Sequence, residues 1–326
     1  MISIVIPIYN EQENLDHLYK RLKGAAPVWK EDYEVILVDD GSSDDSAHMM
    51  KDIAEKDTHF RIVSLSRNFG HQAAISAGIS VSIGDAVIIM DGDLQDPPEE
   101  LPRFLEKWRE GYEVVYAIRT KRKESIFKRA GYASFYRILN LISDIKIPLD
   151  SGDFCVMDRK VVNTLTREMP EQLRFVRGLR AYAGYKQIGI KYERAGRAAG
   201  KEKYTFSKLL GLALDGLFGF STFPLRLATY VGIVIAIPSF IVGIFFIFHR
   251  LIGFKIFGYS PADTPGLATL AVGMFFLGGV MLIMLGIIGE YIGRIYFEVK
   301  KRPFFIIDSI YQNNIKPGKQ VNGIEV

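Results

Sequence analysis

The chain has 326 residues, enough for two ordinary domains or for one large domain with an appendage. A net charge of +4, from 41 Lys and Arg against 37 Asp and Glu, is too small to indicate a nucleic-acid-binding protein. A single cysteine excludes an internal disulfide framework and a cysteine-rich metal cluster. With 48% hydrophobic and 24% charged residues, the composition also excludes a disordered chain and a transporter with many spans.

The N-terminal part of the chain alternates short apolar runs with polar, helix-forming stretches. Apolar runs of strand length occur at 2–8, 33–39, 61–66, 85–91 and 112–118. The helices between them are expected to begin near Glu11, Ser43, Gly70 and Pro97. Strict alternation, with strands apolar on both faces, predicts an α/β fold with a Rossmann-like, mainly parallel sheet covered on both sides. Ligands bind such sheets beyond the carboxyl ends of the strands.

Acidic side chains follow three of these expected strands. Glu11 follows the first, residues 39–40 (Asp-Asp) end the second, and Asp91 and Asp93 follow the fourth. Helix capping explains single acids at such junctions but not three acidic ends that converge on one edge. The two carboxylates of Asp-Gly-Asp suit Mg²⁺ or Mn²⁺, which completes its coordination with phosphate oxygens. The expected partner of this edge is therefore a diphosphate.

Other common sites are disfavoured. The first strand lacks the Gly-x-Gly-x-x-Gly that marks Rossmann dinucleotide binding, and the chain has no Walker Gly-Lys-Ser. Any nucleotide bound here is therefore expected to be held by side chains and metal. The five histidines show no metal-ligand spacing, which disfavours a zinc site. His71 is interpreted as a hydrogen-bonded structural residue, and contact with a substrate is its alternative.

Two long segments near the C-terminus contain no Asp, Glu, Lys or Arg. They are residues 227–249 (about 23) and 264–289 (about 26), and each exceeds the ~20 residues that cross a bilayer as a helix. A pair of buried core helices is the alternative. Basic residues flank the outer ends of both segments, whereas the loop at 250–263 has few. The positive-inside rule therefore predicts that both termini and the 290–326 tail are cytoplasmic and that the loop is external.

The segments beside and within these spans carry further signals. Residues 206–226 have apolar side chains at helical spacing directly before the first span, which predicts an interfacial amphipathic helix. The second span carries Gly286, Gly289 and Gly293, which permit close helix–helix packing. A homo-oligomer is therefore compatible with the sequence.

Five motifs of the chain resemble those of inverting family 2 glycosyltransferases with the GT-A fold. They are IPIYNE (6–11), VDDGSSDDS (38–46), LSRNFGHQAAISAGI (65–79), DGDLQDPPE (91–99) and SGDFCVMDR (151–159). The similar subgroup comprises polyprenyl-phosphate sugar transferases, including dolichol-phosphate mannosyltransferases and bactoprenol glucosyltransferases. The resemblance covers residues 2–225, and two C-terminal spans are typical of the bactoprenol enzymes. It implies a GT-A catalytic domain at 1–205, followed by the interfacial region and the two transmembrane helices.

The resemblance also implies roles for individual residues. Asp91, Asp93 and Asp153 are the expected catalytic residues, and Asp91, Asp93 and Gln95 the expected metal site. Asp153 would lie near the anomeric carbon, and a turn-capping aspartate is its alternative. The residues expected to bind the nucleotide-sugar are Pro7, Tyr9, Glu11, Val38, Asp40, Gly92, Gln95, Arg194, Arg197 and Lys203.

Two positions depart from the family pattern. Glu202 stands where the family often has serine in Gly-x-Ser-Lys-Tyr, which weakens the assignment of that loop's contacts. Cys155 stands where many relatives have arginine after Gly-Asp-Phe, and it is interpreted as a buried, small hydrophobic residue with no chemical role.

A basic cluster follows the fifth strand. Residues 119–137 contain seven Lys and Arg against one Glu, so this stretch is more positive than the whole chain. A solvated helix face is one interpretation. The other is a seat for the phosphate of a lipid acceptor, because arginine binds phosphate through two parallel hydrogen bonds. The residues expected there are Arg119 and Arg122, supported by Lys123, Ser125 and Arg129.

The predicted function is inverting transfer of one hexose from a nucleotide-sugar to undecaprenyl phosphate at the cytoplasmic face of the inner membrane. The attacking phosphate oxygen is already anionic, so no strong general base is needed. By resemblance, glucose from UDP-glucose is the first choice, and GDP-mannose or another nucleotide-sugar is the alternative donor. An enzyme that extends a polysaccharide and a non-catalytic scaffold remain rival interpretations.

Overall fold

The computed structural model describes residues 1–119, 151–169, 171, 175–193, 221–252, 266–313, 320–321 and 324–325. The chain forms two compact units. The first contains the sheet with its helices and also the segment from Lys301 onward, and the second contains two long apolar helices.

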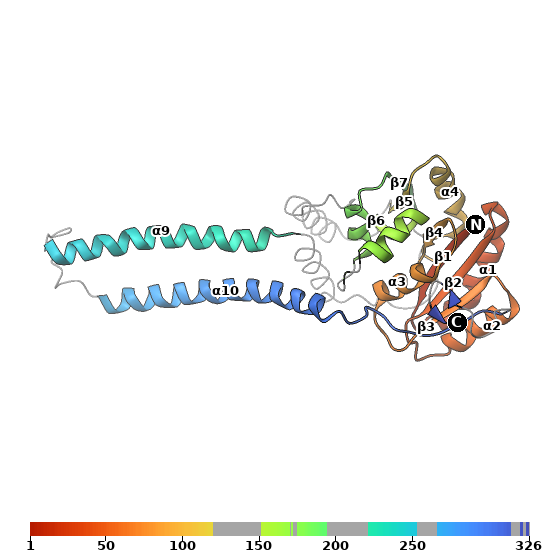
Figure 1. The fold of residues 1–326 in the computed structure, drawn as a ribbon, viewed down its shortest axis with the longest axis horizontal. Coiled ribbons are helices and arrows are strands. Elements are labelled where there is room, and N and C mark those ends of the chain that lie inside the picture. Colours follow the sequence, from red (N-terminus) through yellow and green to blue (C-terminus); the bar gives the residue numbers. More distant parts are fainter. Residues whose placement is uncertain are drawn as a thin grey trace. The chain divides into compact units, whose positions relative to one another are not determined.

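The first unit is built on an eight-stranded sheet (Figure 1). Its strands are β1 (Ile2–Ile8), β2 (Tyr33–Asp39), β3 (Phe60–Leu65), β4 (Ala86–Ile89), β5 (Val114–Arg119), β6 (Ser151–Asp158), β7 (Gln187–Tyr192) and β8 (Ile307–Tyr311). Their order across the sheet is β7-β5-β6-β4-β1-β2-β3-β8. Strands β6 and β8 run antiparallel to their neighbours, and the other pairings are parallel. The predicted α/β fold with a mainly parallel sheet is therefore confirmed.

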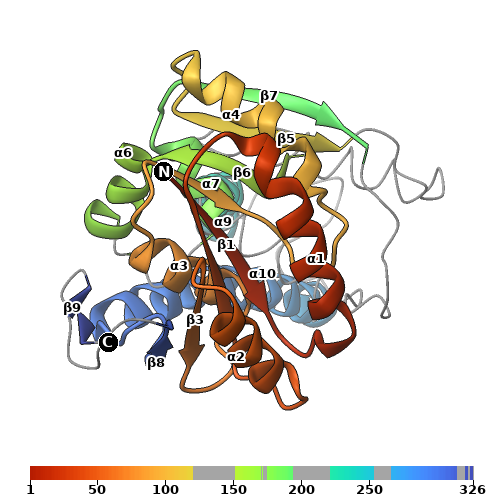
Figure 2. The ribbon, with the colours of Figure 1, turned by 90° about the vertical axis from the view of Figure 1, so that its right-hand side faces the viewer.

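Helices cover both faces of this sheet (Figure 2). One face carries α1 (Gln12–Trp29), α2 (Ser46–Lys56) and α4 (Leu101–Arg109), and the other carries α3 (His71–Val81), α6 (Arg159–Asn163) and α7 (Val176–Tyr182). Short π- and 3₁₀-helical segments lie at Thr164–Glu168 and Pro98–Glu100, and a separate two-stranded pair consists of β9 (Gln320–Val321) and β10 (Ile324–Glu325). The β1 strand is buried on both faces, because Ile4 and Ile6 join the large core cluster while Val5 packs against Gly78 of α3. This double burial explains why the strand sequences are apolar throughout rather than alternating.

Strand β6 is inserted between β4 and β5 and runs antiparallel to both. The sequence pattern does not predict this insertion, although residues 151–159 carry one of the family motifs. Ile89 of β4 pairs with Cys155 of β6. Because β6 is reversed, its first residues lie at the edge where β4 ends, and continuing the register by two residues places Asp153 opposite Asp91.

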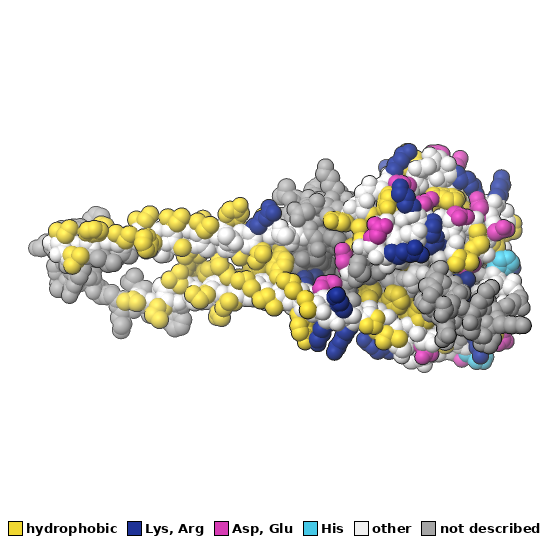
Figure 3. Space-filling model, viewed as in Figure 1, with side chains coloured by type: hydrophobic (Ala, Val, Ile, Leu, Met, Phe, Trp, Pro, Cys, Tyr) yellow, Lys and Arg dark blue, Asp and Glu magenta, His cyan; other side chains and the backbone are white. Residues whose placement is uncertain are grey.

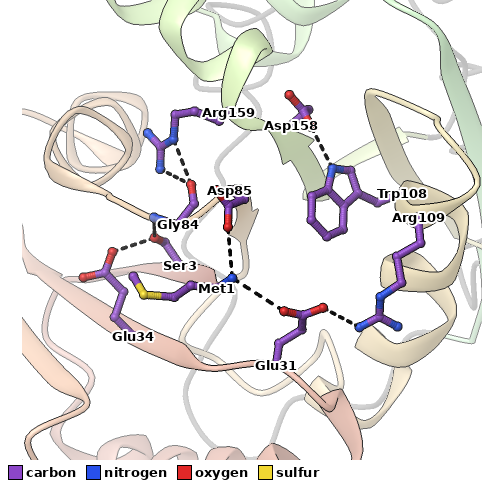
Figure 4. Close-up of polar contacts among 10 residues, drawn as sticks. All are labelled: Met1, Ser3, Glu31, Glu34, Gly84, Asp85, Trp108, Arg109, Asp158 and Arg159. Carbon is purple, nitrogen blue, oxygen red and sulfur yellow. Dashed lines mark hydrogen bonds and ion pairs between the residues drawn. The ribbon is translucent and has the colours of Figure 1, made fainter.

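Polar side chains at the opposite edge of the sheet bind one another (Figure 4). Ser3 of β1 donates to Glu34 of β2 and accepts from the Gly84 N–H at 2.8 Å. Arg159 donates through Nε to the Gly84 carbonyl at 2.8 Å. These bonds join the ends of β1, β2, β4 and β6, so the polar groups at this edge serve the fold.

A buried ion pair lies beneath the same edge. Arg61 of β3 places Nη2 3.0 Å from Oε2 of Glu34, and both side chains are less than a tenth exposed. Arg61 also donates to the Val81 carbonyl at 3.0 Å and to the side chain of Gln312 at 2.9 Å. The pair thereby links β2 and β3 to the C-terminal segment.

That C-terminal segment supplies the edge strand β8, which pairs antiparallel with β3. The Ser66 N–H donates to the Ile306 carbonyl at 3.0 Å, and Asn313 donates to the Glu55 carbonyl at 2.8 Å. The sequence analysis predicts only a cytoplasmic tail at 290–326, and the strand is a finding of the structure. Its pairing covers the edge of β3, which would otherwise present unpaired backbone groups.

The second unit contains α9 (Phe223–Ile252) and α10 (Gly266–Lys300). Hydrophobic side chains extend along both helices (Figure 3), and many are exposed, for example Phe240 at 71% and Leu282 at 71%. Phe223–Val242 and Phe276–Lys300, with mean hydropathies of 2.0 and 1.9, are long and apolar enough to cross a membrane. The most apolar 18-residue stretch of each span is 0% buried, which contradicts the alternative of buried core helices.

Helix α10 continues well beyond the predicted end of the second apolar segment at residue 289. Glu290 and Arg294 are four residues apart and form an ion pair at 3.0 Å. Charged residues mark the end of an apolar segment, but a helix can continue through them. The four-residue spacing of Glu290 and Arg294 stabilises the helix beyond residue 289. The predicted interfacial helix lies almost entirely outside the described residues.

Candidate active site

The loops that follow β1 and β2 are joined by hydrogen bonds. The Asn10 N–H donates to Ser42 Oγ at 3.1 Å, and the Ser43 N–H donates to Asn10 Oδ1 at 2.8 Å. The Glu11 N–H donates to Ser46 Oγ at 3.0 Å. Asn10 has a φ of 52°, a conformation that asparagine tolerates better than most residues. The motifs IPIYNE and VDDGSSDDS therefore form one connected structure at the carboxyl edge of the sheet.

Asp40 connects this structure to the loop after β3. Its carboxylate accepts hydrogen bonds from the Phe69 N–H at 2.7 Å and the Gly70 N–H at 2.9 Å. Burial raises the pKa of Asp40, although these two donors act against the shift. Gly41 has a φ of +68°, and a Cβ there would lie 2.6 Å from the carbonyl carbon of Arg67, so only glycine allows the loops to approach this closely.

The loop after β4 carries Asp-Gly-Asp. Asp93 is only 8% exposed, and its Oδ1 accepts the Gln95 N–H at 3.1 Å. A Cβ on Gly92 would lie 2.7 Å from Cδ1 of Ile8, which explains the glycine between the two acids. At the end of the loop, fully buried Asp96 accepts a hydrogen bond from Tyr192 of β7. The hydrogen bonds at Asp93 and Asp96 thus fix the loop at two points.

His71 at the start of α3 lies between Asp91 and Asp153. Its Nε2 is 3.6 Å from Asp91 Oδ1 and 3.5 Å from Asp153 Oδ2. Burial alone would lower the pKa of His71, but the contact with Asp153 and the charges of both acids raise it to about 9. The ring is therefore a cation at neutral pH, positioned where the ends of β4 and β6 meet.

Two further side chains hold Asp153. Arg177 of α7 places Nη2 3.3 Å from Oδ1, and Gln72 places Nε2 3.5 Å from Oδ2. Gln72 Oε1 also accepts the Val176 N–H at 2.9 Å, which fixes α7 against α3. Burial alone would raise the pKa of Asp153, but the charges of Arg177, His71 and Arg180 outweigh it and hold the pKa well below its usual range. Asp153 is accordingly a permanent carboxylate and a poor proton acceptor.

The predicted nucleotide-binding residues differ in how accessible they are. Pro7 and Glu11 are half-buried, and Tyr9 is 41% exposed. Val38 is fully buried, and its Cγ2 faces Gly78 of α3. The Val38 side chain therefore belongs to the core, and a nucleotide could meet this residue only through its backbone.

Several predicted residues lie outside the described part of the chain. They are Arg122, Lys123, Ser125 and Arg129 of the acceptor cluster and Arg194, Arg197 and Lys203 of the donor loop. Arg119 is the last residue of β5. The two basic stretches thus begin directly after the neighbouring parallel strands β5 and β7.

The structure adds His71, Gln72 and Arg177 to the predicted site. His71 and Gln72 stand in the motif LSRNFGHQAAISAGI, and this was the only available signal for them. Arg177 stands in no quoted motif. The two partners of His71 are the acids that follow β4 and open β6, and these contacts favour the alternative interpretation of His71 as a residue of the site.

The chemistry of the donor set decides whether a metal fits. Among the described residues, no group of three or more His, Cys, Asp and Glu side chains is suited to hold a metal ion. Asp91 and Asp93 supply two hard oxygen donors from one short, fixed loop. This set fits Mg²⁺ or Mn²⁺ that takes its remaining ligands from phosphate and water.

Comparison with known proteins gives a family. Residues 3–166 match the model described as glycosyl transferase family 2. The chain belongs to this family. It is 43% identical over 322 residues to "Uncharacterized glycosyltransferase sll0501" of Synechocystis, covering 98% of this chain and 99% of that one. It is 40% identical over 314 residues to "Bactoprenol glucosyl transferase" of Shigella phage SfII, covering 96% of this chain and 99% of that one.

A solved structure is similar in part. It is glucosyl-3-phosphoglycerate synthase from Mycobacterium tuberculosis in complex with Mn²⁺, UDP and glucosyl-3-phosphoglycerate. The identity is 16%, the TM-score is 0.46, and the match covers 65% of this chain and 76% of that one. Family membership, together with the mainly parallel sheet, confirms the expected GT-A fold, and the chain is a glycosyltransferase.

Proposed function

We propose that this glycosyltransferase moves a single hexose from a nucleotide-sugar to the phosphate of undecaprenyl phosphate, with inversion at the anomeric carbon. The observation that carries the proposal is the state of Asp153. Its contacts with Arg177 and His71 hold the pKa of the Asp153 carboxyl well below its usual range, so the carboxylate is a weak base. Such a site suits a nucleophile that brings its own negative charge, as a lipid phosphate does.

The near full-length similarity to relatives named bactoprenol glucosyl transferase supports the same acceptor class. The match extends over 96% of this chain and therefore includes both apolar helices. Glucose from UDP-glucose is the first choice of donor on these names, and GDP-mannose or another nucleotide-sugar is the alternative. We infer an inner-membrane protein with the catalytic domain and both termini in the cytoplasm, on the basis of the basic residues that flank the spans.

In the proposed reaction an oxygen of the lipid phosphate attacks the anomeric carbon, and the bond from that carbon to the donor diphosphate breaks. The nucleoside diphosphate leaves with the bonding electron pair, so no proton has to be moved. Catalysis then depends on aligning the two substrates and on stabilising the departing diphosphate. Asp153, fixed by its three partners, would orient the sugar beside the attacking phosphate.

Asp91 and Asp93, assisted by Gln95, would hold Mg²⁺ or Mn²⁺. When bound, the ion supplies Lewis-acid stabilisation to the diphosphate. The hydrogen bond from the Gln95 N–H to Asp93 fixes that carboxylate before substrate arrives. Pro7, Tyr9, Glu11, Asp40 and the segment with Arg194, Arg197 and Lys203 would bind the remainder of the donor.

The rival functions make different products. An enzyme that extends a polysaccharide attacks with a sugar hydroxyl and needs a general base, and the contacts with Arg177 and His71 make the Asp153 carboxylate a weak one. A non-catalytic scaffold would bind UDP-glucose without dependence on a divalent ion.

A donor panel tests the proposal. The purified full chain is supplied with undecaprenyl phosphate, Mn²⁺ or Mg²⁺, and either UDP-glucose or GDP-mannose, and the mass of the lipid product is measured. We expect one added hexose, with UDP-glucose as the better donor. A polymer would support the extending enzyme, and no product with either donor would contradict UDP-glucose and GDP-mannose as donors.

Arg122 tests the acceptor cluster. Replacing Arg122 with methionine should raise the KM for the lipid phosphate about 10-fold or more and leave donor binding unchanged, because a charge-assisted bond to the head group is lost. Steady-state kinetics with each substrate varied in turn provides the measurement. An unchanged acceptor KM would remove Arg122 from the acceptor site.

A further inference from the structure

Two arginines lie one turn apart on α7 and face the first half of β6. Arg177 forms an ion pair with Asp153 at 3.3 Å. Arg180 follows three residues later and is only 1% exposed. Its guanidinium carbon lies 5.3 Å from the centre of the Tyr116 ring. Tyr116 pairs with Cys155 of β6, and Cys155 is two residues from Asp153 on the same face of that strand.

The hydrogen-bonding groups of this pair are incompletely used. Among the described residues, Nε of Arg177 and both Nε and Nη2 of Arg180 are buried without a hydrogen-bond partner. Arginine keeps its proton in proteins, so neither group can avoid this cost by becoming neutral. A buried cation with unused donors is expensive, which indicates that a group outside the described residues completes the arrangement.

The charges indicate what is missing. Within the described part of the chain, Asp153 is the carboxylate paired with Arg177, and Arg180 has no ion-pair partner. Asp153 at 16% and Arg177 at 19% remain partly exposed, so an anion could reach the pair from the side of Arg177. Guanidinium groups bind carboxylates and phosphates, and the substrates of the proposed reaction carry phosphates.

We propose that Arg177, with Arg180 behind it, forms a phosphate-binding subsite beside Asp153 at the head of β6. This inference rests on the proposed function and adds to it a cationic group on α7, separate from the basic clusters after β5 and β7. Two phosphate-bearing groups enter the proposed reaction, the head group of the lipid acceptor and the diphosphate of the donor. Both present the oxygens that a guanidinium recognises, and the test distinguishes them.

The test uses the full chain in lipid nanodiscs and two probes that require no turnover. Binding of decyl phosphate represents the lipid head group, and binding of UDP represents the donor diphosphate. Arg177→Met removes the charge and keeps much of the apolar volume. It should weaken the binding of one of the two probes about 10- to 100-fold. Arg177→Lys should recover only part of that loss, because lysine lacks the planar fork. Arg180→Met should act on the same probe more weakly, since Arg180 lies deeper.

The matched control is Arg103→Met, a 55% exposed arginine on α4, which should change neither probe. Loss of decyl phosphate binding assigns the subsite to the acceptor, and loss of UDP binding assigns it to the donor. Unchanged binding of both probes by a folded Arg177→Met variant overturns the subsite. If Arg180→Met fails to fold, the two Arg177 variants still decide the question. Wild-type protein that binds decyl phosphate but forms no sugar lipid contradicts the proposed function and leaves the subsite standing.

Discussion

Replacing Asp93 with asparagine is expected to lower turnover at least about 100-fold while leaving the fold intact. Loss of one metal carboxylate removes several kcal/mol of stabilisation of the departing diphosphate, and each ~1.4 kcal/mol is tenfold in rate. The fold should persist because asparagine has the same shape and its carbonyl oxygen can still accept the Gln95 N–H. Turnover of UDP-glucose with saturating Mn²⁺ is the measurement, and the thermal unfolding midpoint shows that the variant is folded.

Asp16→Asn is the matched control for this substitution. Asp16 is an exposed aspartate on α1, and its replacement should leave turnover unchanged. Full activity of a folded Asp93→Asn variant would contradict the assignment of Asp93 to the metal. Activity that returns when the Mn²⁺ concentration is raised would instead show that the variant binds metal more weakly.

The second large effect concerns stability. Arg61→Met should lower the free energy of unfolding by about 3–5 kcal/mol, because it leaves the buried Glu34 carboxylate without its cation. The same substitution removes the hydrogen bonds from Arg61 to the Val81 carbonyl and to Gln312. Thermal unfolding in detergent, followed by circular dichroism, measures the change.

Arg103→Met again serves as the control, since Arg103 pairs with Glu100 at the surface of α4. An exposed pair of this kind contributes less than about 1 kcal/mol, so its loss should barely move the unfolding midpoint. Equal midpoints for the two arginine variants would show that the buried pair does not stabilise the sheet. Restoration of the Arg61→Met midpoint by a second change, Glu34→Gln, would support the proposed cause.

The order of strands and helices up to β5 follows from local sequence signals. Each of β1 to β5 is a short apolar run, and each helix between them begins close to its predicted start. The runs are recognisable because these strands are covered by helices on both faces and carry few polar residues. The two apolar helices were also predictable, because uncharged apolar segments of this length are typical of membrane-spanning helices.

Strands β6 and β8 could not be predicted in this way. Which strand pairs with which is decided by contacts between residues far apart in the chain, as between Ile89 and Cys155 or between Val63 and Ile310. A short strand at the sheet edge, such as β8, carries only a weak periodic signal. It stands after α10, in the segment for which only a cytoplasmic tail was predicted.

The sequence predicts the acidic residues of the candidate site but not its cationic residues. Asp91, Asp93 and Asp153 stand in motifs, and Asp91 and Asp93 also follow an apparent strand. His71 and Arg177 reach Asp153 only because α3 and α7 pack on the same face of the sheet. Their roles depend on that packing, and no local pattern in the chain reveals it.

The pairing of β8 with β3 has a consequence for synthesis of the protein. The ribosome makes β3 early, whereas β8 is made only after both apolar helices have been produced. Until then the open side of β3 has no strand from its own chain to bind, and chaperones or the translocation machinery would have to shield it from other nascent chains. The sheet of this domain can therefore be completed only after both hydrophobic helices have left the ribosome.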